Sequence, residues 1–185
     1  SMLHLRRGPT AAALRDLLHE SGARAVFWNR KYEPATQPRD AALKKQLREQ
    51  GLRVESANGS LLFEPWDLAT GQGTPYRVFT PFWRAARARW RLPSCWRAPA
   101  RLPACDVAAP VPLSSLGLAP KPDWDRGFWD AWRPGEAGAR ETLEIFIDGA
   151  LRGYREDRDR PDRVGTSRLS PHLHFGEIAP WRVAA

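Results

Sequence analysis

Residues 10–56 alternate between helical and strand-like sequence patterns, which restricts the folds open to this chain. A helix is predicted from Thr10 to about residue 20, with Thr10 as its N-cap and Gly22 as its C-terminal stop. One face of this helix is apolar and carries Leu14, Leu17 and Leu18. The short apolar run 23–28 that follows is typical of a buried parallel strand.

The same pattern then repeats. A second helix is predicted over residues 39–50 and ends at Gly51, and residues 52–56 form the next predicted strand. The apolar side of this helix carries Ala42, Leu43 and Leu47. Helix, strand, helix and strand with tight glycine joints predict an α/β fold with a parallel sheet.

Composition and charge favour a polyanionic partner. The chain has 185 residues, 42% of them hydrophobic, and a net charge of +8. This length suits one domain or parts of two, and the charge suits nucleic acid, although a GC-rich genome explains the arginine content equally well. The sequence has no signal peptide and no membrane-spanning run, so we expect no membrane partner and a cytoplasmic protein. Cys95 and Cys105 would pair only in an oxidising compartment, of which there is no other sign.

Residues 76–101 contain seven arginines and no acidic residue, interleaved with aromatic side chains. Such a mixture can bind nucleic acid through phosphate contacts and base stacking. The alternative, which we favour, is a helix from Pro81 that buries its aromatic residues and exposes its arginines.

The next part of the chain is rich in proline. Residues 93–134 contain eight prolines and predict an extended linker, anchored near its end by Trp124, Phe128, Trp129 and Trp132. A helix is predicted from Glu136. Its apolar stripe consists of Leu143, Phe146, Ile147, Ala150, Leu151 and Tyr154.

Residues 165–170 place three hydroxyl groups beside an arginine. Thr166, Ser167 and Ser170 follow Gly165 and flank Arg168. Glycine lets a backbone approach an anion closely, and hydroxyls, N–H groups and a guanidinium then donate hydrogen bonds to it. A phosphate site is one interpretation of this composition, and an ordinary turn or helix cap is the other.

The order of these residues resembles the flavin-phosphate loop of the DNA photolyase and cryptochrome family. Thr-Ser-Arg-Leu-Ser at 166–170 is followed by Pro-His-Leu-His-Phe-Gly-Glu-Ile at 171–178. Blocks at 28–40, 59–63 and 76–82 also occur in the family's order and at plausible spacing. The chain looks closest to the bacterial class I cyclobutane-dimer photolyases.

This resemblance implies a domain plan. It predicts a Rossmann-like antenna half-domain with a parallel sheet at 1–70, an interdomain linker at 71–135 and the start of an all-α FAD-binding domain at 136–185. The first strands and most of the flavin domain would lie outside the chain, which looks like an excised segment. We therefore expect the chain alone to be inactive.

The resemblance also implies roles for individual residues. The expected FAD contacts are Tyr154, Thr166, Ser167, Arg168, Leu169 and Ser170, and Arg158 matches a DNA-contacting position. Catalytic residues and photoreduction tryptophans are expected beyond Ala185. Folate-carrying members have an Asn-Glu pair where this chain has Ala35 and Thr36, which disfavours folate and leaves a deazaflavin, another chromophore or none.

The function implied is light-driven repair of cyclobutane pyrimidine dimers in ultraviolet-damaged DNA by a monomeric FAD enzyme. A cryptochrome-type photoreceptor and a non-enzymatic basic nucleic-acid-binding module are the alternatives. His172 and His174 lack the spacing of a metal site, so no metal is predicted and packing beside Phe175 is expected. Ala179 before Pro180 lacks a capping side chain for the helix expected there.

Overall fold

The computed structural model describes residues 3–92, 99–101 and 107–185. Packing divides the chain into two compact units, one of Ser1–Ala57 with Trp96–Gly127 and the other of Asn58–Cys95 with Phe128–Ala185. The two cysteines, Cys95 and Cys105, whose pairing the sequence leaves open, lie outside the described residues.

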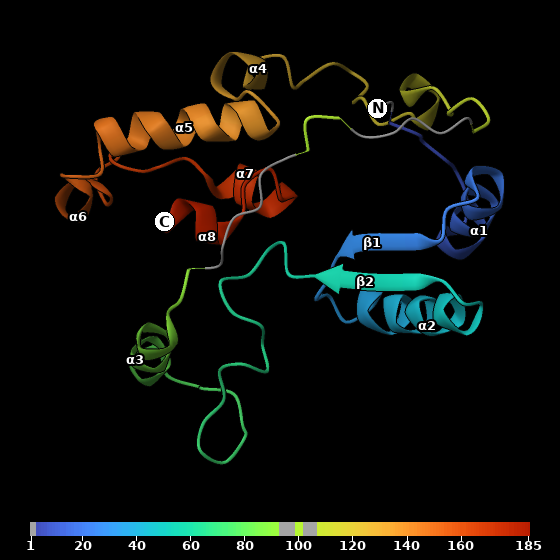
Figure 1. Ribbon diagram of the computed structural model, residues 1–185. Helices are drawn as coiled ribbons and strands as arrows, with labels where there is room; N and C mark the ends of the chain where they lie inside the picture. The colour runs from blue at the N-terminus through green and yellow to red at the C-terminus, as the bar shows by residue number, and fades with distance from the viewer. Residues whose placement is uncertain (1–2, 93–98, 102–106) are drawn as a thin grey trace. The chain divides into compact units, whose positions relative to one another are not determined.

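The first unit is built on two parallel strands, each preceded by a helix (Figure 1). Helix α1 spans Thr10–Ser21 and precedes β1, Ala25–Asn29; helix α2 spans Thr36–Glu49 and precedes β2, Arg53–Ala57. The register pairs Ala25 with Arg53 and Asn29 with Ala57. The predicted parallel α/β arrangement is therefore confirmed.

The core of this unit lies between α2 and the sheet. Leu43, Leu47 and Val54 are buried there, and partly buried side chains pack around them: Leu14, Leu18, Val26, Trp28 and Leu52. Ala42 was predicted to share this face, but it is exposed, because it lies about 100° around the helix axis from Leu43.

Two predicted helix starts are wrong. Pro9 occupies the N-cap of α1 and Thr10 is already helical, so the Thr10 side chain caps nothing. Helix α2 begins at Thr36 instead of Arg39, because Thr36 donates through its N–H to the Glu33 carbonyl (3.0 Å) and through its hydroxyl to the Glu33 carboxylate (2.9 Å). The predicted stop at Gly22 is confirmed by a left-handed φ of 63°.

Part of the proline-rich stretch belongs to the first unit. The N–H of Val111 donates to the carbonyl of Leu5 (3.0 Å), and that of Ala108 donates to the carboxylate of Glu20 (3.2 Å). A short 3-10 turn, η1, follows at Leu113–Leu116.

The described residues of the second unit form helices and connecting loops. The helices are α3 Phe79–Arg89, α4 Phe128–Ala131, α5 Glu136–Asp148, α6 Tyr154–Asp157, α7 Ser170–Phe175 and α8 Pro180–Val183. The order of a parallel α/β unit followed by helices agrees with the predicted fold class. Among the described residues, no helix combines the length and hydropathy needed to cross a bilayer.

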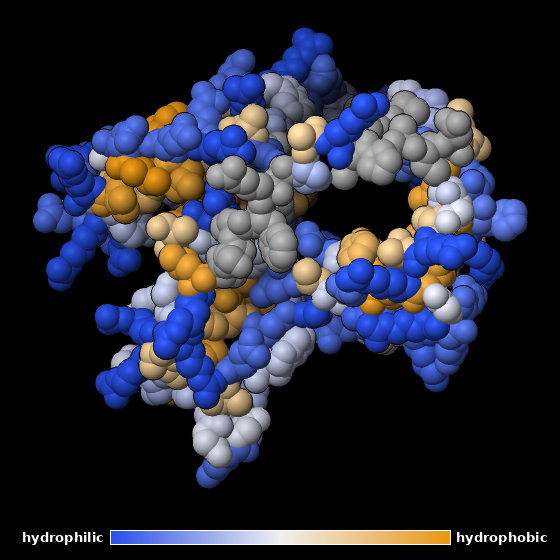
Figure 2. Space-filling model, viewed as in Figure 1, coloured by the Kyte–Doolittle hydropathy of each residue, from blue (hydrophilic) through white to orange (hydrophobic). Residues whose placement is uncertain are grey.

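The predicted apolar stripe after Glu136 is interrupted. Helix α5 ends at Asp148, and Leu151 N–H donates back to the carbonyl of Phe146 (2.9 Å), so Tyr154 begins a separate short helix. Apolar side chains around this end of α5 are exposed, among them Ile145, Ile147 and Leu151. Figure 2 shows apolar surface over this part of the second unit.

The predicted aromatic anchors of the linker are largely uncovered. Trp124, Phe128 and Trp129 are all more than half exposed, so little of the described structure covers them. Trp132 is the exception, since it is partly buried with its ring edge against His172.

Candidate functional site

The loop at 165–170 is fixed at its start by a close backbone contact. Gly165 is buried, and a Cβ on it would lie 2.4 Å from the carbonyl oxygen of Asp157 and 2.7 Å from the Asp157 Cβ. Real Cβ atoms do not approach a neighbour this closely, so only glycine fits. The contact holds the loop against α6.

Three polar side chains of the loop face solvent. Thr166, Arg168 and Ser170 are exposed, and within the described part of the chain their side chains have no hydrogen-bond partner. Two hydroxyls and one guanidinium are therefore available to an external acceptor. A phosphate group offers such acceptors.

The backbone of the loop turns sharply at Arg168, which has a φ of 53°. A non-glycine residue in this left-handed region is uncommon and often marks a functional position. Leu169 follows with right-handed angles, φ −81° and ψ −6°. Alternating left- and right-handed residues direct successive N–H groups toward one side, an arrangement that binds anions.

Ser167 and Leu169 contribute differently. The hydroxyl of Ser167 is partly buried and accepts a long hydrogen bond from the N–H of Leu169 (3.4 Å). The side chain of Leu169 is 1% exposed and belongs to the core, so this residue can offer a ligand only its backbone. The buried side chain of Leu169 thus anchors the loop in the protein core.

Tyr154 and Arg158 lie at the two ends of α6. The Tyr154 ring is 40% exposed and meets the ring of Phe146 edge-on, with centroids 5.8 Å apart. Arg158 N–H donates to the Tyr154 carbonyl (3.1 Å). Asp157 of the same helical turn contacts Gly165, so Tyr154 and Arg158 lie on a helix that packs against the start of the loop.

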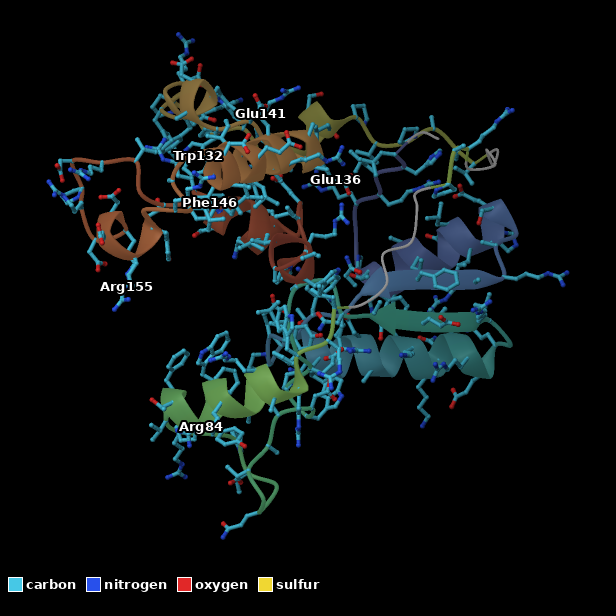
Figure 3. The ribbon with its side chains drawn as sticks, turned by 60° about the vertical axis from the view of Figure 1, so that its left-hand side comes forward. Arg84, Trp132, Glu136, Glu141, Phe146 and Arg155 are labelled. Carbon is cyan, nitrogen blue, oxygen red and sulfur yellow. The ribbon has the colours of Figure 1, made fainter. Side chains whose placement is uncertain are left out.

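Most charges between residues 155 and 163 are neutralised by their neighbours. Arg160 donates two hydrogen bonds to Asp162 (2.8 and 3.1 Å), which lowers the pKa of that carboxyl, and Arg163 pairs with Asp157 (2.8 Å). Arg158 makes a longer contact with Asp159 (3.4 Å) and is half exposed. Arg155 is exposed and, within the described part of the chain, has no side-chain partner; Figure 3 shows it extending away from α6.

A pair of a buried histidine and a partly buried glutamate lies directly after the loop and is absent from the sequence-predicted site. His172 is 2% exposed, and its Nδ1 lies 2.6 Å from a carboxylate oxygen of Glu177. The hydrogen bond from His172 lowers the pKa of Glu177, and a backbone hydrogen bond from Gly135 adds to the effect. Since Gly135 precedes α5, the pair ties α7 to the start of α5.

Sequence spacing carries a signal for this pair. Gly176 is left-handed (φ 72°), and Glu177 N–H donates to the His172 carbonyl (2.8 Å), which together form a Schellman-type helix end. This helix end brings the side chains of His172 and Glu177, which are five residues apart, into contact. Among the described residues, the Nε2 atom of His172 is buried without a partner.

The second histidine behaves as expected. The ring of His174 packs edge-on against Phe175, with centroids 4.8 Å apart. Within the described residues, no group of three or more His, Cys, Asp or Glu side chains could hold a metal ion. Ala179 occupies the N-cap of α8 without a capping hydrogen bond, as predicted.

Comparisons with known proteins identify the family of this chain. A family model described as DNA photolyase matches residues 1–105. The deoxyribodipyrimidine photo-lyase of Agrobacterium fabrum is 49% identical over 184 residues, and cryptochrome-1 of Arabidopsis thaliana is 34% identical over 183 residues. Each alignment covers 96% of this chain.

A solved structure matches as well. The crystal structure of a bacterial class III photolyase from Agrobacterium tumefaciens superposes with a TM-score of 0.82 at 47% identity over 95% of this chain. The sequence resemblance favoured class I, whereas this relative is described as class III; the family is common to both. The chain spans 38% of the A. fabrum photo-lyase, 26% of the cryptochrome and 37% of the crystallised chain.

Proposed function

The chain belongs to the DNA photolyase family, and we propose that it is part of an enzyme that repairs cyclobutane pyrimidine dimers in DNA with light. The observation that carries the proposal is the loop at 165–170. Its exposed hydroxyls and guanidinium have no acceptor within the described part of the chain, and its backbone is held in an anion-binding shape.

We assign the diphosphate of FAD to this loop. Thr166, Ser170 and Arg168 would donate to phosphate oxygens, and Ser167 would share its hydroxyl between the ligand and the turn. When bound and reduced, the flavin supplies the electron that light transfers to the dimer. Tyr154 contributes an exposed ring at the start of α6, beside the same loop.

The proposed partner is ultraviolet-damaged DNA, bound by a monomer. A stacked dimer cannot reach a cofactor inside a protein, so it must be flipped out of the duplex. Arg158 would bind the phosphate backbone during this step, since its contact with Asp159 is long and its side chain is half exposed. Catalytic contacts to the dimer are assigned to sequence outside this chain.

For the antenna chromophore, the structure supports the case against folate. The hydroxyl of Thr36 is already used, because it donates to both the carbonyl and the carboxylate of Glu33. Neither Thr36 nor Ala35 offers the carboxylate that the folate-binding pattern has at this place. A deazaflavin, another chromophore or no antenna is therefore the proposal.

A cryptochrome-type photoreceptor is the second candidate function. It is supported by the 34% identity to cryptochrome-1 of A. thaliana over 96% of this chain. The loop and α6 serve flavin binding equally in both cases. The higher identity to the A. fabrum photo-lyase, 49%, favours repair.

The test uses a full-length protein that contains this chain. We expect flavin absorbance bands in the purified protein and loss of cyclobutane dimers from an irradiated oligonucleotide under blue light. Flavin bands without repair would favour the photoreceptor, and a protein without flavin would leave a basic nucleic-acid-binding module. The 185-residue chain alone is expected to bind flavin weakly and to repair nothing.

A further inference from the structure

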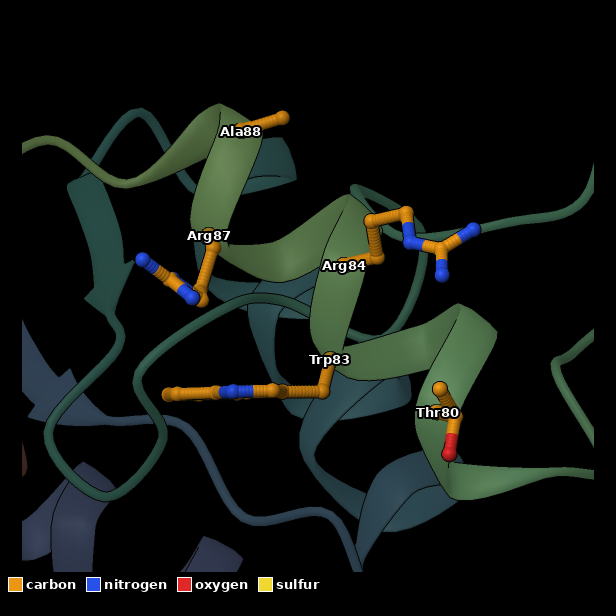
Figure 4. Close-up of a pocket in the computed structure, with 5 residues that line it drawn as sticks. All are labelled: Thr80, Trp83, Arg84, Arg87 and Ala88. Carbon is orange, nitrogen blue, oxygen red and sulfur yellow. The ribbon is translucent and has the colours of Figure 1, made fainter.

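Helix α3 presents a polar and aromatic face that the flavin site does not use. Phe82, Ala86 and Trp90 form its inner side, where Ala86 is fully buried. The outer side lines a hollow of about 390 Å³. Its lining, drawn in Figure 4, consists of Thr80, Trp83, Arg84, Arg87 and Ala88.

Two aromatic residues of α3 are exposed, Trp83 on the outer side and Phe79 at the first position of the helix. Trp83 is 46% exposed and Phe79 is 70% exposed, and their rings are almost parallel, 9° apart in orientation with centroids 6.2 Å apart. The helix predicted from Pro81 begins two residues earlier, at Phe79, and the prediction that it buries its aromatic residues is wrong for Trp83. Exposed aromatic faces provide a surface on which a planar base can stack.

The cations on this side have no internal counter-charge. Arg84 and Arg87 are exposed and, in the described part of the chain, pair with no carboxylate; α3 itself contains no acidic residue. Arg89 differs, because it donates to the backbone carbonyl of Asp67. Figure 4 shows Arg87 and Trp83, four residues apart, projecting in the same direction from the helix.

We propose that this outer face of α3 binds a single strand of DNA. Arg84 and Arg87 would bind successive phosphates, and an unpaired base would stack on Trp83. Duplex bases are covered by their neighbours, so a stacking site of this kind selects single-stranded nucleic acid. The inference rests on the proposed function only in its choice of DNA as the polyanion.

The first test measures the charge contribution. The 185-residue chain is titrated with a fluorescein-labelled, undamaged thymidine dodecamer in the dark, over a range of salt concentrations. For Arg84→Gln/Arg87→Gln we expect the slope of log affinity against log salt to fall by about 1.4, since each phosphate contact on a single strand contributes about 0.7. Glutamine keeps the helix propensity of arginine.

The matched control removes the same charge elsewhere. Arg15 of α1 and Arg140 of α5 are also exposed and helical, and in the described residues their side chains have no partner. Arg15→Gln/Arg140→Gln should leave the salt slope unchanged. An equal fall in the slope in both double variants would overturn the proposal, because only net charge would then matter.

The second test measures stacking. Trp83→Leu should weaken binding of the thymidine dodecamer roughly 5- to 150-fold, as expected for loss of one base–aromatic stack. Trp129→Leu, at another exposed tryptophan, should leave the affinity for the dodecamer unchanged. On an abasic strand with the same phosphates, Trp83→Leu should have no effect.

Three further results would overturn the proposal: no binding of the dodecamer, an equal loss for Trp83→Leu on the abasic strand, or tighter binding of polyglutamate than of the dodecamer. The experiment uses neither flavin, light nor lesion. Its failure leaves the repair proposal intact, and a flavin-free full-length protein would leave the α3 proposal intact.

Discussion

Gly165 lies so close to Asp157 that a single added carbon would collide with the Asp157 carbonyl oxygen, at 2.4 Å. This contact connects the two halves of the candidate flavin site. Asp157 closes α6, which begins with Tyr154, and Gly165 opens the loop that carries Thr166, Ser167 and Ser170.

The first prediction concerns Gly165→Ala. The new Cβ meets backbone and not a flexible side chain, so the loop or α6 must shift, at a cost of about 1–3 kcal/mol in unfolding free energy. In the full-length protein, flavin affinity should fall together with the melting temperature.

Gly71→Ala is the control for this change. Gly71 is exposed, and a Cβ there would meet nothing within 4 Å. Its melting temperature and flavin affinity should match those of the wild type. Unchanged flavin binding in Gly165→Ala would show that the contact with Asp157 does not shape the site.

The second prediction concerns the pH dependence of stability at Glu177. The pKa of Glu177 is lowered below its usual 4.5, chiefly by His172, so the folded state favours the ionised carboxyl. Its contribution is complete above about pH 4.5 and is lost as the pH falls through the lowered pKa. Glu177→Gln should therefore lower the free energy of unfolding near pH 7 by about 0.5–1.5 kcal/mol, the net worth of one hydrogen bond.

The gap between Glu177→Gln and the wild type should close as the pH is lowered below 4.5. Denaturant unfolding at several pH values measures it. Glu144→Gln, an exposed glutamate on α5, serves as the control and should show no gap at any pH. A gap that stayed constant down to pH 3 would exclude the carboxylate of Glu177 as its source.

The third prediction concerns Arg158→Ala in the full-length protein. If Arg158 binds a DNA phosphate, the salt slope for duplex DNA should fall by about one, while the flavin content stays the same. Arg155→Ala is a demanding control, because Arg155 lies on the same short helix, is exposed and has no side-chain partner in the described structure. Identical slopes for the two variants would assign the effect to general charge.

The fold was predictable where local signals agree with packing. Glycine stops and apolar periodicity located both strands to within two residues and established their parallel pairing. The start of α2 was missed because the side-chain hydrogen bond between Thr36 and Glu33 extends the helix toward its N-terminus. Apolar periodicity alone does not predict such a side-chain hydrogen bond.

The candidate site was predictable in part. The residue order of the loop identifies its polar groups, but periodicity placed Tyr154 on the stripe of α5, which in fact ends at Asp148. The His172–Glu177 pair depends on a left-handed turn at Gly176 that brings two distant side chains together. The exposure of Trp83 was also missed, since apolar periodicity does not say whether anything covers the face it predicts.

The central claim is that the loop at 165–170 binds the diphosphate of FAD, and Ser167→Ala/Ser170→Ala in the full-length protein tests it most directly. Each charge-assisted hydrogen bond contributes about 1.5–3 kcal/mol, so the loss of two should weaken flavin binding by a factor of roughly a hundred or more. The flavin-free protein should lose only about 1 kcal/mol or less, from the long turn bond between Ser167 and Leu169.

Ser114→Ala/Ser115→Ala is the matched control, because Ser114 is exposed and the Ser115 hydroxyl donates to the Pro112 carbonyl (2.7 Å) in a similar turn. The decisive measurement is the flavin dissociation constant of both double variants beside the melting temperature of their flavin-free forms. We predict a dissociation constant raised roughly a hundredfold in Ser167→Ala/Ser170→Ala alone, with little change in melting temperature. An unchanged dissociation constant with a lower melting temperature would contradict the claim and make the loop an ordinary turn.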